Sequence, residues 1–293
     1  MKILVFGSIN VDMVFSVNHM VLPGETIKSS SMKKNAGGKG ANQSVALAKS
    51  GSEVYFAGRV GADGLWLKEI LADNGVDTTY LKEVEGPTGQ AIIQLDKNKQ
   101  NSIIILPGAN GKISESEIDE VLSNFDCGDY LVLQNEIPKV NYLINKAKEK
   151  GLKICLNPSP FEKEILEWNL EKVDLMIVNE IEACELLQKK TDDFLELLNL
   201  LTDKFNNCDF VLTAGSEGAY YKGKEGVSFA SSVDVKVKDT TAAGDTFLGY
   251  FVTLISEGIS ADEALSDACY AAGLAVSKFG AIKSIPTRKE VRG

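Results

Sequence analysis

The chain has 293 residues, of which 44% are hydrophobic, and a formal net charge of −10. It is long enough for one large α/β domain or two smaller ones, and its acidic balance argues against a basic surface for nucleic acids. No apolar run approaches the roughly 20 residues of a membrane span, and the five cysteines form no C-x-x-C pair, so we expect a cytoplasmic protein without a membrane anchor, zinc site or disulfide framework.

Short apolar, β-rich runs alternate with helical patterns along the chain. Strands are predicted at 2–8, 53–58, 130–134, 152–157, 174–178 and 209–215. Helices are predicted at 40–51, 64–75, 140–151, 181–189, 243–257 and 261–278. Buried strands that alternate with helices are typical of an α/β fold with a mainly parallel sheet covered on both faces.

Two regions, about 11–34 and 86–106, break this rhythm because they hold strand-like segments with no helix between them. Residues 88–96 and 101–106 are typical of a hairpin around Asp96, Lys97, Asn98 and Lys99. Strands without intervening helices need a sheet of their own. We therefore expect one domain over 1–293 with a small β-sheet lid that is discontinuous in sequence.

The strongest local motif is D-T-T-A-A-G-D-T-F-L-G-Y-F at 239–251, a turn of small residues that leads into an apolar helix. Ala242, Ala243 and Gly244 would let an anion approach their backbone N–H groups, where a helix N-terminus adds partial positive charge. Asp245 would place a carboxylate beside a bound phosphate. This arrangement suits phosphoryl transfer to a hydroxyl, with the carboxylate as general base.

Helix capping is the competing explanation of this motif, since Asp239 or Asp245 at the start of a helix commonly acts as a cap. From the physics of the residues alone, the two interpretations are about equally good. The chain has a single histidine, His19, which favours a carboxylate for any proton transfer.

A second motif, N-A-G-G-K-G-A-N-Q-S-V-A-L-A-K-S-G at 35–51, opens a predicted helix. Gly37 and Gly38 would allow a ligand to approach the backbone closely, and Lys39 and Asn42 would point polar groups at a hydroxylated ligand. The spacing is not that of a Walker phosphate loop. Taken alone, an ordinary glycine-rich turn is the better explanation.

Polar residues also follow several predicted strands, at the edge where open α/β sheets bind ligands. Asn10 and Asp12 follow the first strand in G-S-I-N-V-D (7–12), Glu136 follows the strand at 130–134, and Asn179 and Glu182 follow the strand at 174–178. Their side chains fit contacts with a sugar or with metal-bound water. Taken singly, each is more often a cap or a surface residue.

Together, these motifs resemble the ribokinase-like carbohydrate kinase family, in which they occur in the same order. The resemblance extends from about residue 2 to residue 287 and rests on G-S-I-N-V-D, P-G-E-T, G-G-K-G-A-N-Q, the N-x-x-E of 179–182, and D-T-T-A-A-G-D-T-F. It implies a Rossmann-like domain with a small β lid, often a homodimer formed through the lids. It also implies ATP-dependent phosphorylation of a sugar, most closely as in members that convert D-ribose to ribose 5-phosphate at O5.

The resemblance implies roles for individual residues around the sugar. The residues that would hold the sugar are Asn10, Asp12, Gly38, Lys39, Asn42 and Glu136. Those that would cover it from the lid are Ala91, Ile93 and Ile105, and closure of the lid would exclude water. Gly244 matches the anion hole and Asp245 the general base.

The resemblance also implies the nucleotide and metal residues. Asn179 and Glu182 match the element near the phosphates and hydrated Mg²⁺. The positions that would line ATP are Thr213, Gly215, Ser216, Glu217 and Gly218, with Cys269 near the adenine. The positions implied for K⁺ are Asp239, Thr241, Ala275, Lys278, Gly280 and Ser284. Cys269 departs from the histidine or asparagine of some members, and Gln90 and Gln94 of the lid have no assigned role.

Other functions are weighed against this one. Within the family, the acceptor is alternatively 2-deoxyribose, fructose or the ribose of a nucleoside, although the polar set suits a small, fully hydroxylated sugar. A non-catalytic sugar-binding protein is disfavoured because Asp245 and the A-A-G turn are intact. A dinucleotide oxidoreductase is disfavoured because G-S-I-N-V-D, rather than G-x-G-x-x-G, follows the first strand.

Overall fold

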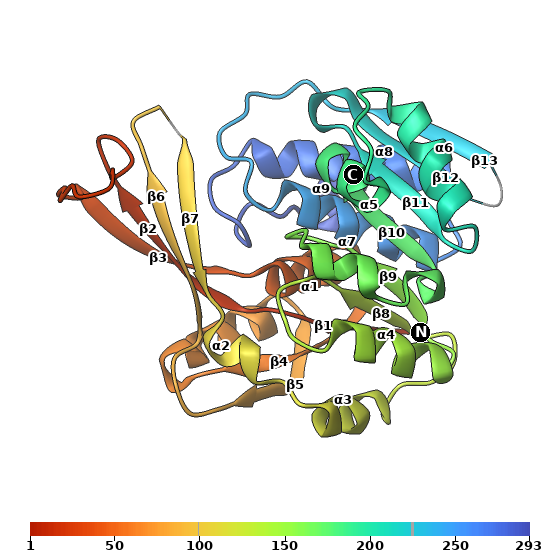
Figure 1. Cartoon of the computed structure of the whole chain (residues 1–293), viewed down its shortest axis with the longest axis horizontal. Coiled ribbons are helices and arrows are strands. Elements are labelled where there is room, and N and C mark those ends of the chain that lie inside the picture. The colour runs from red at the N-terminus through yellow and green to blue at the C-terminus, as the bar shows by residue number, and fades with distance from the viewer. Residues whose placement is uncertain (99, 224–225) are drawn as a thin grey trace.

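The computed structural model describes residues 1–98, 100–223 and 226–293. Within these ranges, the main sheet consists of β1 (Lys2–Phe6), β4 (Glu53–Val60), β5 (Val76–Glu83), β8 (Tyr130–Leu133), β9 (Lys153–Leu156), β10 (Leu175–Asn179), β11 (Asp209–Thr213), β12 (Gly218–Gly223) and β13 (Gly226–Ser231). Their order is β13-β12-β11-β10-β9-β8-β1-β4-β5 (Figure 1). The strands from β11 to β5 are parallel, and β12 and β13 add an antiparallel edge.

Helices cover both faces of this sheet. One face carries α1 (Lys39–Ser50), α2 (Leu65–Asp73), α7 (Ala243–Ser256) and α8 (Ala261–Val276). The other carries α3 (Glu115–Leu122), α4 (Val140–Glu149), α5 (Glu180–Leu187) and α6 (Phe194–Lys204). Ile3 and Val5 of β1 pack toward the first group, whereas Leu4 and Phe6 pack toward the second. Because side chains alternate along a strand, a sheet covered on both faces forms two separate cores.

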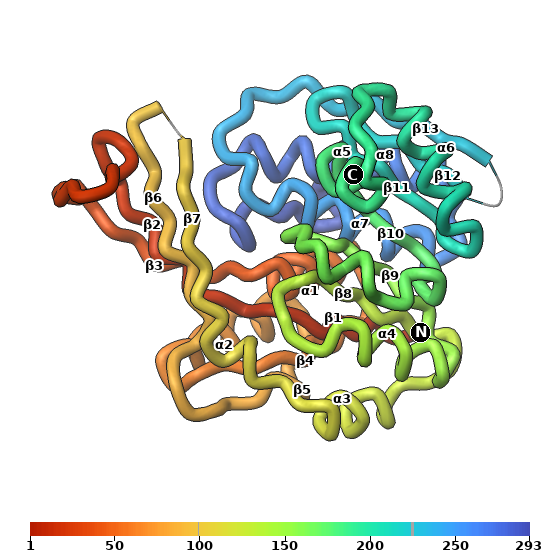
Figure 2. Tube along the Cα trace, viewed as in Figure 1, coloured from red at the N-terminus to blue at the C-terminus, as the bar shows by residue number. Residues whose placement is uncertain are grey.

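A second, four-stranded sheet is built from β2 (Asn10–Ser16), β3 (Ser31–Gly37), β6 (Gly89–Leu95) and β7 (Asn101–Leu106), in the order β3-β2-β6-β7. β2 and β6 pair in parallel, and the two outer pairs are antiparallel. Figure 2 shows the chain leaving the main body once in its red segment and once in its yellow segment to form this sheet. These are the two regions that break the alternation of strands and helices, and the strands extend slightly beyond them, to Asn10 and Gly37.

The predicted fold class is confirmed, and a strand or helix is found at each position predicted for the main domain. The sequence patterns do not predict β5, α3, α6 or the β12–β13 hairpin. β5 is a half-polar edge strand, V-D-T-T-Y-L-K-E, without a continuous apolar run, and α3 has apolar residues at helical spacing but is only eight residues long. The predicted turn at 96–99 includes Lys99, which lies outside the described residues.

The described ranges contain no helix that is long and apolar enough to cross a membrane. They also contain no group of three or more His, Cys, Asp and Glu side chains placed to hold a metal ion. The five cysteines are free thiols, and Cys155, Cys208 and Cys269 are buried.

Helices α1 and α7 run side by side in the same direction. Their contacts recur every four residues, pairing Asn42 with Asp245, Ala46 with Gly249, and Ser50 with Thr253. A Cβ on Gly249 would lie 2.3 Å from the Ala46 Cβ and 2.6 Å from the Ala46 carbonyl carbon. Only glycine permits this approach, so the two helices pack at backbone contact and their N-termini meet.

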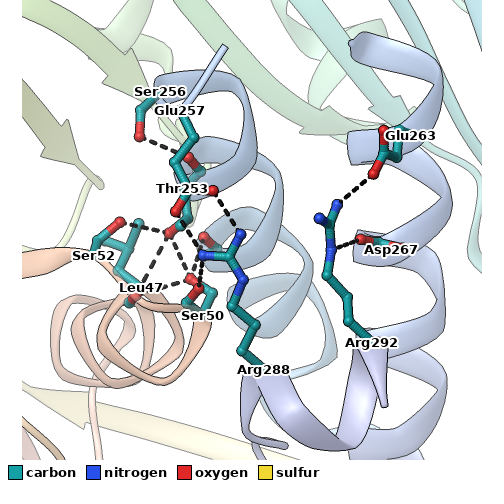
Figure 3. Close-up of polar contacts among 11 residues, drawn as sticks. Leu47, Ser50, Ser52, Thr253, Ser256, Glu257, Glu263, Asp267, Arg288 and Arg292 are labelled. Atoms are coloured by element: carbon teal, nitrogen blue, oxygen red, sulfur yellow. Dashed lines mark hydrogen bonds and ion pairs between the residues drawn. The ribbon is translucent and has the colours of Figure 1, made fainter. Parts of the chain in front are cut away.

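The C-terminal ends of the two helices are fastened by buried hydroxyls and an arginine (Figure 3). Ser50 Oγ and Thr253 Oγ1 share a short hydrogen bond between the helices. From α9 (Arg288–Arg292), Arg288 donates to the Ser50 carbonyl at 3.2 Å and to both oxygens of Glu257 at 2.6 Å. The pair is therefore linked by polar contacts at both ends.

Replacing Gly249 by alanine should push α1 away from α7, because the new methyl group would overlap the side chain and backbone of Ala46. Overpacking of this kind typically costs about 1–3 kcal/mol, so we expect the free energy of unfolding to fall by about 2 kcal/mol in urea titrations. The matched control is Gly273→Ala in α8, where the nearest atom is the Val233 Cβ at 3.2 Å. Both changes gain the same helix propensity, so equal stability of the two variants would contradict the packing described.

Candidate active site

The predicted residues Asn10, Gly38, Lys39 and Glu136 lie near the carboxyl ends of β1 and β8, neighbouring strands at which the order of the sheet reverses. Open α/β sheets bind ligands at such a switch point. A Cβ on Gly40 would lie 2.6 Å from the Ser8 nitrogen, and a Cβ on Gly7 would lie 2.3 Å from Gln134 Oε1. The two glycines therefore allow α1 to begin directly above the ends of the two strands.

Glu136, at the end of β8, fixes the first turn of α1. Its Oε2 accepts a 3.0 Å hydrogen bond from the Lys39 backbone N–H and a short one from Ser8 Oγ. Gly38 precedes the helix with a φ of 94°, and a Cβ there would lie 2.9 Å from Ile9 Cα. The backbone conformation and the close contact thus require glycine at position 38. Glu136, a predicted sugar contact, also holds the first turn of α1 in place.

The first turn of α7 presents unobstructed N–H groups. Ala242 precedes it in the left-handed conformation, with φ 61° and ψ 13°, which typically costs about 1–3 kcal/mol. A Cβ on Gly244 would meet no atom of the described residues within 4 Å. Ala243 donates its N–H to the Thr240 carbonyl at 3.3 Å, whereas the N–H groups of Gly244 and Asp245 have no acceptor among the described residues. This end of the helix is suited to an anion.

Asp245 is buried, and each of its carboxylate oxygens accepts a hydrogen bond from an amide of α1. Asn42 Nδ2 donates to Oδ2 at 3.0 Å, and Gln43 Nε2 donates to Oδ1 at 2.9 Å. Neither bond caps α7, whose N-terminus receives no side-chain cap from the described residues. The capping explanation therefore does not account for Asp245.

A cavity of about 220 Å³ opens onto this carboxylate and the start of α7. The predicted residues that line it are Lys39, Asn179, Glu182, Thr213, Ala242, Ala243, Gly244 and Asp245. Lys39 Nζ has no hydrogen-bond or ion-pair partner in the part of the chain that the structure describes. Its charge is therefore available to a ligand in this cavity.

Asn179 and Glu182 form a capping box at the start of α5. Asn179 Oδ1 accepts from the Glu182 N–H at 2.8 Å, and Glu182 Oε2 accepts from the Asn179 N–H at 3.0 Å. The helix-cap interpretation of this pair is therefore correct. Both residues also line the cavity, so the box holds a carboxylate at its wall.

A second cavity, of about 830 Å³, lies beside Glu136 and the base of the small sheet, and is also lined by Asn10 and Ile105. Asn110, in a 3₁₀ turn after β7, donates from Nδ2 to Asn10 Oδ1 at 2.8 Å. The same side chain accepts from the Ile9 N–H at 3.1 Å. Asn10 is thus held in place by a residue that the motifs do not identify.

Asp12 lies on β2 in register with Ala91 and then Ile105 of the neighbouring strands, and Ile93 shares that face. Its burial and, secondarily, the charge of Glu136 raise the pKa of its carboxyl to about 7. On this face of the small sheet, the Asp12 carboxyl group therefore lies among the apolar side chains of Ala91, Ile93 and Ile105.

The other predicted nucleotide residues lie in different surroundings. Residues 215–217 form an exposed 3₁₀ turn after β11. Gly218 begins the hairpin with a φ of 124°, and a Cβ there would lie 2.0 Å from the Ala230 carbonyl oxygen. Cys269 is buried in the core between α8 and β13, with its thiol 3.7 Å from the same carbonyl oxygen, and burial raises its pKa to about 11.

Asp239 joins two loops near the N-terminus of α7. Its Oδ1 accepts from the Thr241 N–H at 3.0 Å and hydroxyl at 2.6 Å, and its Oδ2 accepts from the Gly280 N–H at 3.0 Å. Partial burial opposes ionisation, but these hydrogen bonds lower the pKa of Asp239. Lys278 instead pairs with α9, and Ser284 is fully buried. The structure thus connects Asp239, Thr241 and Gly280 directly.

The motifs miss the amides that hold the site together, which are Gln43, Asn110, Gln134 and Asn157. Gln43 belongs to the G-G-K-G-A-N-Q motif and follows Asn42 directly. Gln134 and Asn157 stand at the last positions of two predicted strands. A polar residue at the end of a predicted strand is a signal that could identify Gln134 and Asn157, because Asn10, Glu136 and Asn179 are selected for following strands in the same way.

Known proteins resemble this chain along nearly its whole length. The pfkB family of carbohydrate kinases matches residues 1–288. A ribokinase of Haemophilus influenzae is 37% identical over 294 residues, covering 98% of this chain and 95% of the relative. A deoxyribokinase of Salmonella typhi is 32% identical, with coverage of 98% and 96%. The structure of Arabidopsis thaliana ribokinase complexed with ribose and ATP has a TM-score of 0.87 and 33% identity, covering 99% of this chain and 97% of the other.

These matches confirm the resemblance inferred from the motifs, since they span nearly every residue that carries it. The switch-point site and the two-sheet fold agree with the same assignment. By sequence and by fold, the chain belongs to the pfkB family of carbohydrate kinases.

Proposed function

We propose that this sugar kinase transfers the γ-phosphoryl group of ATP to the O5 hydroxyl of D-ribose, giving ribose 5-phosphate. The observation that carries the proposal is the buried Asp245 carboxylate at the start of α7, beside N–H groups that have no acceptor in the part of the chain that the structure describes. A base next to an anion site is what phosphoryl transfer to a hydroxyl requires. The ribose and ATP bound by the Arabidopsis relative support the choice of substrates.

The sugar would lie between the N-terminus of α1, Glu136 and the Asp12 face of the small sheet. Asn10, Asp12 and Glu136 would accept hydrogen bonds from its hydroxyls, and Lys39 would donate. Asn42 Oδ1 is buried without a hydrogen-bond partner among the described residues. Such an acceptor costs about 1–3 kcal/mol, which a sugar hydroxyl would recover on binding.

In the transfer step, Asp245 would accept the O5 proton as that oxygen attacks the γ-phosphorus and the bond to the ADP oxygen breaks. The backbone of Ala242 to Gly244 forms the proposed anion hole, and the Gly244 N–H is its least obstructed donor. With the Lys39 ammonium group, it would stabilise charge on the transferring phosphoryl group. No histidine is needed for the proton.

Mg²⁺ fits the cavity wall that Asn179 and Glu182 form. This ion usually keeps several waters and uses one or two carboxylates together with substrate phosphates. Glu182 supplies such a carboxylate, with one oxygen bound to the Asn179 N–H and the other making no hydrogen bond within the described ranges. These two residues would hold the hydrated ion, which neutralises phosphate charge when bound.

K⁺ fits the two loops that Asp239 joins, beside the carbonyl end of α8 at Ala275. The lowered pKa of Asp239 keeps a negative charge there. Thr241 and Gly280, already held by Asp239, lie on the two loops. A weakly hydrated ion at this place would fix the loop that leads into the anion hole.

The small sheet would act as a lid over the sugar and as the interface of a homodimer in the cytoplasm. Every residue of β7 is exposed, and the four apolar residues at 103–106 are 46% to 59% exposed. An exposed apolar edge strand readily pairs with another chain. The same sheet carries Asp12, so dimerisation and closure would act on one structure.

The alternative acceptors are 2-deoxyribose, fructose and a nucleoside. The similarity to a deoxyribokinase favours keeping 2-deoxyribose as the second candidate. Comparing kcat/KM for ribose and these three alternatives in a coupled ADP-release assay distinguishes them. Ribose should give the highest value.

Replacing Asp245 by asparagine should preserve the fold and ribose binding, because the side chains have the same shape. Loss of the general base should lower kcat about 1,000-fold or more in the ADP-release assay. The matched control is Asp262→Asn, an exposed aspartate in the first turn of α8, which should turn over normally. Near-normal turnover by Asp245→Asn would contradict its assignment as the base.

Potassium should activate the enzyme, because an ion bound near Asp239 would order the loop before α7. We expect a higher kcat in potassium chloride than in tetramethylammonium chloride at equal ionic strength. Asp239→Ala should remove most of that difference. Equal rates of the unmodified enzyme in the two salts would argue against the site.

The raised pKa of Asp12 predicts a pH-dependent cost in stability. Between its ordinary pKa of 3.8 and the folded value of about 7, only the folded state holds the proton, so stability falls as pH rises through this window. Asp12→Asn removes this contribution. In urea unfolding, the gain of the variant over the unmodified protein should therefore be larger at about pH 8 than at about pH 5. The same gain at both values would show that the Asp12 carboxyl titrates normally.

A further inference from the structure

A chain of buried amides connects the main sheet to Asp245. Gln43 Nε2 donates to Asp245 Oδ1 at 2.9 Å, and Gln134 Nε2, at the end of β8, donates to Gln43 Oε1 at 2.7 Å. Gln43 Nε2 also donates to Asn157 Oδ1 at 3.3 Å, and Asn157 Nδ2 donates to the Ile177 carbonyl at 3.0 Å. Gln43 and Gln134 are completely buried. The orientation of the Gln43 side chain is thus determined from several sides.

The carboxylate sets the direction of the hydrogen bonds from Gln134 through Gln43. An ionised carboxylate only accepts, so Gln43 turns its amino group to Asp245 and its carbonyl oxygen to Gln134. Gln134 must then turn its amino group to Gln43, which leaves Gln134 Oε1 buried without a partner among the described residues. Burying an unpaired acceptor is unfavourable. The Gln134 amide therefore lowers the stability of the folded state by a desolvation cost that an apolar side chain at position 134 would avoid.

Gln43 and its neighbour Asn42 have different surroundings. Asn42 also binds Asp245, and its Oδ1 is buried without a hydrogen-bond partner among the described residues. Gln43 is completely buried, and its amide is bound within the protein: Nε2 donates to Asp245 and Asn157, and Oε1 accepts from Gln134. It lines neither cavity itself, so it can act on a ligand only through Asp245 and Asn157, which line the first cavity. The second oxygen of the carboxylate is therefore anchored by a side chain that belongs wholly to the protein.

We propose that Gln43, supported by Gln134, is the positioning residue that holds the Asp245 carboxylate in the orientation required for proton transfer. This inference rests on the proposed role of Asp245 as general base. Without the Gln43 contact, Asn42 would be the one remaining side-chain partner of the carboxylate among the described residues, and the carboxylate could rotate about that bond. A displacement on the order of 1 Å at a reacting group can lower the rate about 100-fold.

Gln43→Met tests the proposal, because methionine keeps the length of the side chain and removes its amide. We expect kcat to fall about 10- to 100-fold, while KM for ribose and for ATP changes less than about threefold. Gln134 contacts neither Asp245 nor either cavity, and Gln134→Met should also lower kcat, but by less than Gln43→Met does. Because Gln134 acts through Gln43, the double variant should equal Gln43→Met alone.

Val45→Ala is the control for lost stability, since Val45 is fully buried on the same helix and outside the amide chain. It should lower Tm but leave kcat unchanged.

An unchanged kcat in Gln43→Met, or effects that multiply in the double variant, would overturn the inference. If Gln43→Met does not fold, a normal kcat in Gln134→Met overturns it. Asp245→Asn separates the two claims, because its inactivity upholds the proposed function even when the Gln43 inference fails.

Discussion

Backbone contact between α1 and α7 is the constraint on which the candidate site depends. Gly249 against Ala46 sets the separation of the two helices, and the contacts four residues on either side of this pair follow from it. The helices come from opposite ends of the chain. Their close packing places the amides of one beside the carboxylate of the other, so catalytic geometry and core packing have the same origin.

Several residues of the candidate site, each proposed to face a ligand, also hold the protein together. Glu136 orders the first turn of α1, Glu182 completes a capping box, and Asp239 joins two loops. Each leaves part of its carboxylate, or the backbone that it orders, available to a ligand. The residue type alone therefore does not distinguish a structural role from a functional one at these positions.

The sequence predicts the fold class well because buried parallel strands and amphipathic helices have distinct periods. It also predicts many of the residues that the fold brings together at the candidate site, because glycine turns and residues after strands are local signals. It does not predict β5 or the β12–β13 hairpin, whose edge strands lack a continuous apolar run. Gln43, Gln134 and Asn110 were missed for another reason: their roles depend on contacts with residues about one or two hundred positions away.

The central claim is that Asp245 faces the hydroxyl that is phosphorylated. A crystal structure with ribose and a non-hydrolysable ATP analogue tests it most directly. The account predicts that O5 lies about 2.6–3.2 Å from a carboxylate oxygen of Asp245, with the γ-phosphate at the N–H groups that begin α7. A ribose whose O5 lies out of reach of Asp245, or a γ-phosphate bound away from α7, would contradict it.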